Sequence, residues 1–307
     1  MSRPVDKIAF GAVKAVAILP LRVLYLFSDL LYILLYYVLR YRRKVALANI
    51  AASFPEKSDA EHRRICRLFY RNFSDYIFET LKLAHISDDE MRRRMTFENV
   101  ELMNSHIAAG RSVVAYFSHC FNWEWAPSVT LHYDHSTALK VEFCQVYRPL
   151  RNQAFDNLML RLRGRFGSLS LKKRSVLRDL LHFRRDATVT VTGFMSDQKP
   201  SHGDPIHVVD FLNHPTAVIT GTETLASRLG MAAIYWDITK LSRGHYKITM
   251  RNLSDDVSKE PEMEVTHRYF AMLADTIRHN PSNWLWTHKR WKHKVTMDMN
   301  DKNLRLE

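Results

Sequence analysis

The order of apolar and polar positions predicts strands that alternate with helices along most of the chain. Runs rich in β-branched and aromatic residues, which predict strands, cover residues 112–118, 138–147, 187–194, 206–212, 232–239 and 245–252. Stretches with helical periodicity cover residues 123–132, 152–164, 171–185, 216–229 and 262–279. This alternation is typical of a sheet that helices cover on both faces. We therefore predict an α/β fold with a single mixed sheet flanked by helices.

The region before residue 112 is predicted to be largely helical. Ser58, Asp59, Ala60 and Glu61 form the sequence of a capping box, in which the first and last side chains satisfy backbone N–H groups at a helix start. An amphipathic helix is expected from this box to about Leu83. A further helix is expected near residues 98–109.

An apolar segment near the N-terminus is predicted to anchor the chain in a membrane. Residues 8–40 are apolar with few breaks, and the densest run, residues 23–39, is seventeen residues long with Asp29 in its middle. That length is near the short end of what a spanning helix needs. Tyrosines and a following basic cluster are typical of a membrane interface whose basic end is cytoplasmic. The cluster consists of Arg40, Arg42, Arg43 and Lys44.

This anchor can be a single span or a helix lying in the membrane plane, and a buried core helix is the alternative to both. Pro20 would break or kink a longer helix. No small-residue cleavage site follows, which argues against a removed signal peptide. The simplest division is a membrane anchor at residues 1–45 and one catalytic domain at residues 46–307.

Charge and cysteine content narrow the partners and the compartment. The net charge of +13 indicates an anionic partner: nucleic acid, a membrane surface or a phosphorylated substrate. We favour the membrane because of the apolar segment. Cys66, Cys120 and Cys144 have neither metal-ligand spacing nor an even count for disulfides, which fits a reducing compartment. Cys120 is expected to be a buried filler and not a nucleophile.

His119 and Glu124 are the strongest candidates for catalysis. They follow the strand-like run 113–117 and lie five residues apart, an offset that fits neither one helix face nor one strand face. The two side chains can meet only if a helix starts between them, with Asn122 as its cap and Glu124 in its first turn. Histidine takes a proton near neutral pH, and a carboxylate can hold its ring in the useful tautomer. A chance match of this spacing is the alternative.

Other polar residues are expected at the same edge of the sheet. Arg148 follows the second predicted strand, and it would emerge beside His119 if the two strands are parallel. Its guanidinium can clamp a phosphate or stabilise an oxyanion. Asp197 and Gln198 follow the third strand, where they can orient hydroxyl groups or the Arg148 head group. A surface arginine and a polar turn are the plainer interpretations.

Two further tracts combine basic residues with aromatic or apolar ones. The segment 280–292 interleaves tryptophans with basic residues, which suits a membrane headgroup layer, while a core position for Trp284 and Trp286 is the alternative. The tract from Arg161 to Arg185 is rich in Arg and Lys. An acidic carrier protein or anionic headgroups could dock there, and a solvated helix face is an equal alternative.

Taken in order, these features resemble the late acyltransferases of lipid A biosynthesis, a branch of the glycerolipid and lysophospholipid acyltransferases. That superfamily has a His-x4-Asp/Glu signature after a strand. The resemblance covers roughly residues 20–295. The motifs that carry it besides His119 and Glu124 are Tyr41-Arg42-Arg43, the segment from Asn49 to Phe54-Pro55, Tyr147-Arg148-Pro149, Asp197-Gln198, Thr220-Gly221 and Trp286-x3-Arg290.

The resemblance implies a membrane-bound enzyme that moves a fatty acyl chain from a thioester to a lipid hydroxyl. His119 would be the general base and Glu124 its orienting partner. Arg148, Asp197, Gln198 and Arg290 would bind substrate, although Asp197 and Gln198 depart from the Glu-containing motif of other members.

The resemblance also implies the setting of the reaction. The co-substrate would be acyl-acyl carrier protein or acyl-coenzyme A, with no cofactor and no metal. The acceptor would be a membrane lipid, most simply a lipid A precursor. The enzyme would lie at the bacterial inner membrane with its catalytic domain on the cytoplasmic face.

Three rival functions stay open at this point. The acceptor could be another lipid, such as a lysophospholipid or an aminoacyl lipid. The chain could be a non-catalytic basic membrane protein. A nucleic-acid binder that uses the tryptophan and arginine tract is the third, and the apolar anchor counts against it.

Overall fold

The computed structural model describes residues 4–201, 204–292, 295–296 and 305–306. Its centre is a seven-stranded mixed sheet with the strand order β1-β9-β8-β2-β5-β3-β4. The strands are β1 Met95–Glu98, β2 Val113–Phe117, β3 Val141–Tyr147, β4 Leu169–Lys172, β5 Val189–Met195, β8 Ala232–Ser242 and β9 His245–Ser254. Two small antiparallel pairs accompany it, β6 Ile206–Phe211 with β7 His214–Ile219, and β10 Val295–Thr296 with β11 Arg305–Leu306. The prediction of an α/β fold with one main mixed sheet is confirmed.

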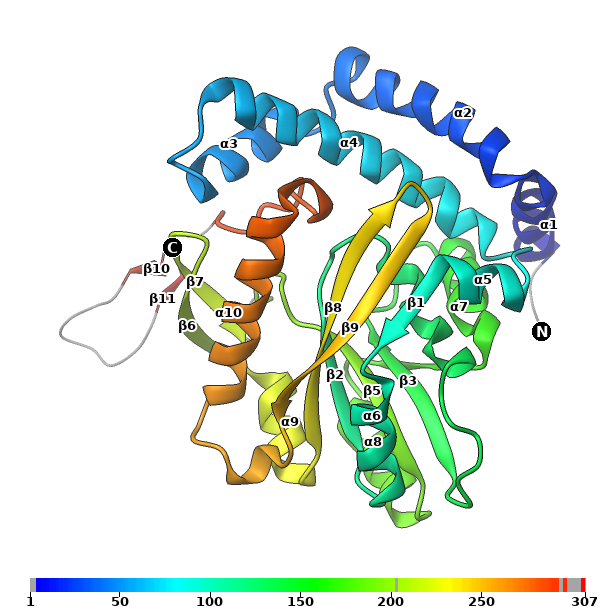
Figure 1. Ribbon diagram of the computed structural model, residues 1–307, viewed down its shortest axis with the longest axis vertical. Helices are drawn as coiled ribbons and strands as arrows, with labels where there is room; N and C mark the ends of the chain where they lie inside the picture. The colour runs from blue at the N-terminus through cyan, green and yellow to red at the C-terminus, as the bar shows by residue number, and fades with distance from the viewer. Residues whose placement is uncertain (1–3, 202–203, 293–294, 297–304, 307) are drawn as a thin grey trace.

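The helices surround this sheet (Figure 1). The α-helices are α1 Pro4–Ile18, α2 Leu21–Ile33, α3 Arg43–Ser53, α4 Asp59–Lys82, α5 Asp88–Arg94, α6 Val100–Ala108, α7 Gln153–Arg163, α8 Val176–Arg185, α9 Gly221–Leu229 and α10 Glu264–His279. A π-helical turn, η1 Leu34–Val38, continues α2. Short 3₁₀ helices are η2 Trp123–Leu131, η3 Gly164–Phe166, η4 Val257–Lys259 and η5 Pro281–Asn283.

The centre of the sheet is parallel and buried. Strand β2 pairs in parallel with β5 on one side and with β8 on the other, and β5 pairs in parallel with β3. All five residues of β2 are buried, as expected of a strand that elements cover on both faces. The sheet is mixed because β8 and β9 form an antiparallel hairpin. The carboxyl ends of β2, β5 and β3 therefore meet at one edge.

The sequence analysis missed the short strands β1, β10 and β11, and it also missed β4 and β7, which overlap stretches predicted as helices. Predicted helices at 171–185 and 216–229 instead begin at Val176 and Gly221, after β4 and β7. The turn between β6 and β7 is Leu212–Asn213, and both residues have positive φ. Hairpin turns of this kind usually contain glycine. Without it, the turn carried no visible signal.

The long helix α4 begins as predicted. The Ser58 side chain accepts a hydrogen bond from Glu61 N–H, and the Glu61 carboxylate accepts one from Ser58 N–H, which completes the capping box. The helix then runs to Lys82. It lies beside α2 above the tip of the β8–β9 hairpin (Figure 1). These N-terminal helices therefore form a layer over one end of the sheet.

One side of α2 is fixed to the rest of the protein by polar contacts. The Ser28 hydroxyl donates to Asp75 of α4 over 2.7 Å, and Asp29 forms a 2.7 Å ion pair with Arg243 at the hairpin tip. Large apolar residues are exposed on the other side of α2 and along η1 to its C-cap, among them Leu26, Leu30, Val38 and Leu39, each more than 60% exposed. Within the described residues, Leu21–Val38 is the single stretch long and apolar enough to cross a membrane. The Ser28 and Asp29 side chains thus contact protein, and the apolar ones face outward.

Candidate active site

The predicted site residues gather at the carboxyl edge of the central strands. His119 follows β2, Arg148 follows β3, and Asp197 and Gln198 follow β5. Since these three strands are parallel, their last residues lie side by side, with Phe117 opposite Met195. The expectation that Arg148 shares an edge with His119 is confirmed.

A short hydrogen bond joins His119 to Asp197. The His119 Nδ1 and Asp197 Oδ1 atoms lie 2.7 Å apart, and the backbone N–H of His119 donates to Asp197 Oδ2 over 3.0 Å. Trp284 Nε1–H donates to the same Oδ2 over 2.8 Å. The carboxylate thus receives three donors and fixes both the ring and the backbone of His119.

Asp197 is ionised in this setting. Its side chain is 1% exposed, and burial by itself raises the pKa of a carboxyl group. The positive charge that His119 can carry and the hydrogen bonds from His119 and Trp284 outweigh burial, and they lower the pKa of Asp197 to about 2. An ionised carboxylate can only accept hydrogen bonds. The ring proton of His119 is therefore assigned to Nδ1.

With Nδ1 protonated, Nε2 of His119 is the basic nitrogen. The side-chain amide nitrogen of Gln198 lies 3.0 Å from it and donates to it. The His119 ring also meets the Trp123 ring edge-on, with 5.0 Å between centroids. Both neighbours hold the ring in one orientation, and Gln198 occupies the position that a hydroxyl group would need.

Glu124 has a different partner from the one expected. Its carboxylate accepts a bidentate pair of hydrogen bonds from Arg163 of α7, at 2.8 and 2.6 Å, and one from Trp123 Nε1–H at 3.2 Å. The carboxylate bonded to the His119 ring is that of Asp197, whereas the sequence analysis gave this role to Glu124. The local prediction around Glu124 is confirmed, because Asn122 caps the helix by accepting from Glu124 N–H. That helix is 3₁₀, not α.

A cavity of about 520 Å³ opens beside these residues. His119, Glu124, Gln198 and Arg148 line it together with Arg163, Lys173 and Lys199. The remaining wall is mainly apolar and includes Phe117, Val146, Phe194, Ile219 and Leu225. Apolar walls suit an acyl chain, and the cations suit phosphate groups.

Arg290 and His288 are close enough to Asp197 to be affected by its charge, and they are not among the residues that line this cavity. Arg290 is 3% exposed and donates to the Ala217 carbonyl over 2.7 Å. Burial lowers its pKa to about 10, although the negative charge of Asp197 opposes that change. Burial likewise lowers the pKa of His288 to about 4. This position lets Arg290 act on the charge of Asp197, whereas the sequence analysis placed it against substrate.

Two contacts of the site had no clear signal in the sequence, that of Arg163 with Glu124 and that of Trp284 with Asp197. Arg163 was one of many cations in the tract 161–185, and only the fold shows that it meets Glu124. Trp284 and Trp286 are 2% and 0% exposed, so the prediction that they lie in a headgroup layer is wrong and the core alternative holds. The role of Cys120 as a buried filler is confirmed by its 1% exposure.

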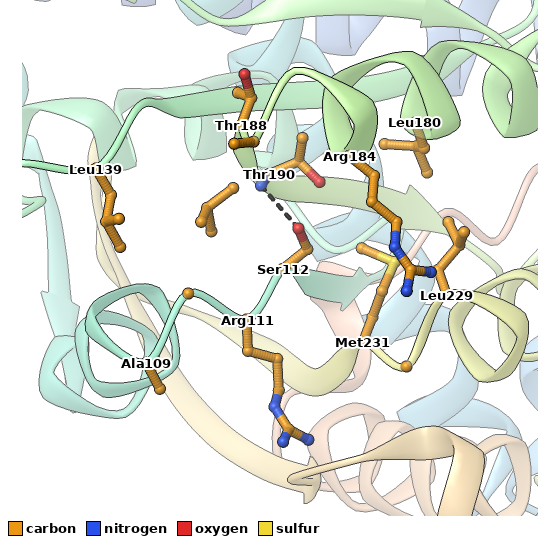
Figure 2. Close-up of a pocket in the computed structure, with 14 residues that line it drawn as sticks. Ala109, Arg111, Ser112, Leu139, Leu180, Arg184, Thr188, Thr190, Leu229 and Met231 are labelled. Carbon is orange, nitrogen blue, oxygen red and sulfur yellow. Dashed lines mark hydrogen bonds between the residues drawn. The ribbon is translucent and has the colours of Figure 1, made fainter.

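A second cavity, of about 510 Å³, lies at the opposite edge of the sheet (Figure 2). It is lined by Arg111, Arg184 and the amino end of β5, where Thr190 N–H donates to Ser112 Oγ over 3.0 Å. None of the predicted site residues lines it. Within the described residues, no group of three or more His, Cys, Asp or Glu side chains could hold a metal ion. The chemistry-bearing residues therefore concentrate at the carboxyl edge.

Comparison with known proteins identifies the family of the chain. Among curated proteins, no match was found. A family model, described as bacterial lipid A biosynthesis acyltransferase, matches residues 4–293 of the 307. The match includes both the N-terminal helices and every residue of the site. The chain belongs to the bacterial lipid A biosynthesis acyltransferases.

Proposed function

We propose that this protein transfers a fatty acyl chain from an acyl thioester to a hydroxyl group of a lipid A precursor. Family membership supports the acyl transfer and the lipid A pathway. The observation that carries the chemistry is His119, whose Nδ1 is held by ionised Asp197 while Nε2 presents its lone pair at the cavity. A base in this orientation can activate a hydroxyl nucleophile.

The reaction follows from this arrangement. The acceptor hydroxyl displaces the Gln198 amide, gives its proton to His119 Nε2, and forms a bond to the thioester carbonyl carbon. Arg148, which lines the cavity, stabilises the negative oxygen of the tetrahedral intermediate. When the carbon–sulfur bond breaks, the thiolate takes the proton from His119. An enzyme-bound acyl group is not needed, because a thioester is already activated.

Glu124 and Arg163 have a separate role in this proposal. Their bidentate pair forms part of the wall of the cavity that His119 also lines. Arg163 is partly exposed there, so it presents a cation to an anionic substrate while Glu124 keeps it in place. Glu124 thus shapes the binding of substrate, and Asp197 orients the base.

The donor and the membrane define the setting. We propose that acyl carrier protein or coenzyme A carries the acyl group, since both are acidic and the last turn of α8 is basic. No other cofactor is proposed. The outward apolar side of α2 suits a helix lying in the plane of the membrane, because the contacts of Asp29 and Ser28 hold its other side against protein. The catalytic domain would face the cytoplasm at the inner membrane.

Lipid mass spectrometry of bacterial cells tests this function. Cells that lack the native copy would express the wild-type chain, His119→Ala, or the control His135→Ala, whose exposed ring hydrogen-bonds the Thr130 carbonyl and meets the Tyr133 ring edge-on. We expect lipid A lighter by one acyl group with His119→Ala alone, and the mass difference gives the chain length. An acyl loss in another lipid would change the acceptor. Identical lipids in all three strains would contradict an acyltransferase role.

A further inference from the structure

Glu79 of α4 is a fully buried carboxylate outside the catalytic cavity. Its side chain is 0% exposed, and Lys240, whose charge acts on it, hydrogen-bonds to Asn72 and Asp75. Burial raises its pKa, with the charge of Lys240 opposing that change. A carboxylate in such a place is costly unless its hydrogen bonds are complete.

Three donors from three separate elements converge on this carboxylate. Tyr25 of α2 donates its hydroxyl to Oε1 over 2.9 Å. Tyr246 of β9 donates to Oε2 over 2.8 Å, and Asn122 Nδ2 donates to the same oxygen over 3.0 Å. The Glu79 carbonyl also accepts a bond from Trp125 Nε1–H over 3.0 Å. Glu79 therefore joins the outer helix layer, the hairpin and the segment that follows His119.

The contact with Asn122 leads directly to the catalytic cavity. The Oδ1 atom of Asn122 accepts from Glu124 N–H, so its amide can satisfy Glu124 and Glu79 only in one orientation. The next residues are Trp123, which packs against the His119 ring, and Glu124, which lines the cavity. If Glu79 no longer accepts from Asn122, the cap on Glu124 and the position of Trp123 lose their common support.

We infer that Glu79 is a positioning residue that ties the membrane-facing helix α2 to the active-site segment 121–125. It touches no cavity residue that we assign to the chemistry, and it acts through the amide of Asn122. The placement of α2 against a membrane is thereby coupled to the shape of the cavity. This inference rests on the proposed acyltransferase function.

The test uses full-length purified protein with acyl thioester and lipid A precursor in mixed micelles. In Glu79→Gln, the amide carbonyl can still accept from Asn122 and Tyr246, so we expect kcat within about threefold of wild type. In Glu79→Leu, no acceptor remains, and we expect kcat to fall by at least about tenfold, which is roughly 1.4 kcal/mol of transition-state stabilisation. The melting temperature is recorded for each, and assays are run well below it.

A second pair of variants tests the link to α2 by deleting one hydroxyl at a time. Tyr25→Phe removes a donor to Glu79. The matched control is Tyr32→Phe, because Tyr32 also lies on α2 but its hydroxyl contacts that of Tyr37 in η1. We expect a severalfold loss of kcat with Tyr25→Phe and none with Tyr32→Phe. The Tyr25→Phe change should add nothing to Glu79→Leu, as expected for residues that act through one network.

The outcomes separate this inference from the function on which it rests. A folded Glu79→Leu enzyme with wild-type kcat, beside an inactive His119→Ala, would overturn the inference alone. A lowered melting temperature with unchanged kcat would also overturn it, since that result means a purely structural role. If Glu79→Leu does not fold, equal kcat values for Tyr25→Phe and Tyr32→Phe would overturn the coupling. Activity in His119→Ala would overturn the proposed function.

Discussion

The replacement Asp197→Asn gives the sharpest test of how the base is oriented. Asp197 Oδ2 accepts from both His119 N–H and Trp284 Nε1–H, so the single carbonyl oxygen of the new amide side chain would take this position. Its NH₂ group would then face His119 Nδ1, at the site of the present 2.7 Å hydrogen bond. A hydrogen bond cannot form between two N–H donors, so His119 Nδ1 would have to accept from the new amide and the ring proton would move to Nε2.

The expected loss of kcat follows from the change of His119 tautomer. With the proton on Nε2, the nitrogen at the cavity has no lone pair for the acceptor hydroxyl. The same change in a serine protease triad lowers kcat by about 10⁴, and a loss of about 10³ to 10⁴ corresponds to roughly 4 to 5.5 kcal/mol. Asp197→Asn is nearly isosteric, so we expect the fold to survive.

The assay compares two carboxylate-to-amide changes in the same site. Initial rates of acyl transfer are measured for Asp197→Asn and for Glu124→Gln, with melting temperatures as the fold control. Glu124→Gln leaves the His119 tautomer unchanged and weakens only the contact with Arg163, so we expect a loss of about tenfold, or roughly 1.4 kcal/mol. Asp197→Asn activity within tenfold of wild type would refute the reasoning. A much larger loss in Glu124→Gln would return the orienting role to that residue.

Three further predictions concern stability and membrane binding. Burial lowers the pKa of His288 from 6.5 to about 4, so stability should fall as pH drops from about 6.5 towards 4, where the unfolded chain binds the proton first. Urea midpoints of His288→Gln should show a weaker fall. Leu30 is 63% exposed on α2, and Leu30→Asp should weaken binding to anionic vesicles at least about tenfold in flotation assays, without a change in melting temperature. Arg163→Met leaves the Glu124 charge without its partner. The free energy of unfolding measured in urea should fall by about 2 kcal/mol, less than for a fully buried pair because Arg163 is partly exposed. Unchanged stability in Arg163→Met would mean that the pair is not formed.

Much of the site could be predicted because a parallel sheet gathers strand ends. His119, Arg148, Asp197 and Gln198 each follow a β-rich run, and the order of strands and helices was enough to place them at one edge. The cap formed by Asn122 was equally accessible, because it depends on residues only two positions apart. Strand β4 was not, since it pairs with β3, where Leu169 lies opposite Cys144. Strand β7 pairs with its neighbour β6, but the turn between them contains no glycine that would have marked the hairpin.

The sequence by itself determined the α/β class, the main helices and the apolar outer segment, and it singled out His119 as the candidate base. Only the tertiary structure decided which carboxylate contacts the His119 ring. Glu124 is five residues from His119, but the 3₁₀ turn directs it to Arg163, while Asp197 arrives from a strand 78 positions away. The spacing of residues along the chain limits which side chains can meet through local backbone geometry. The choice among several carboxylates depends on sheet pairing and burial, which no local pattern encodes.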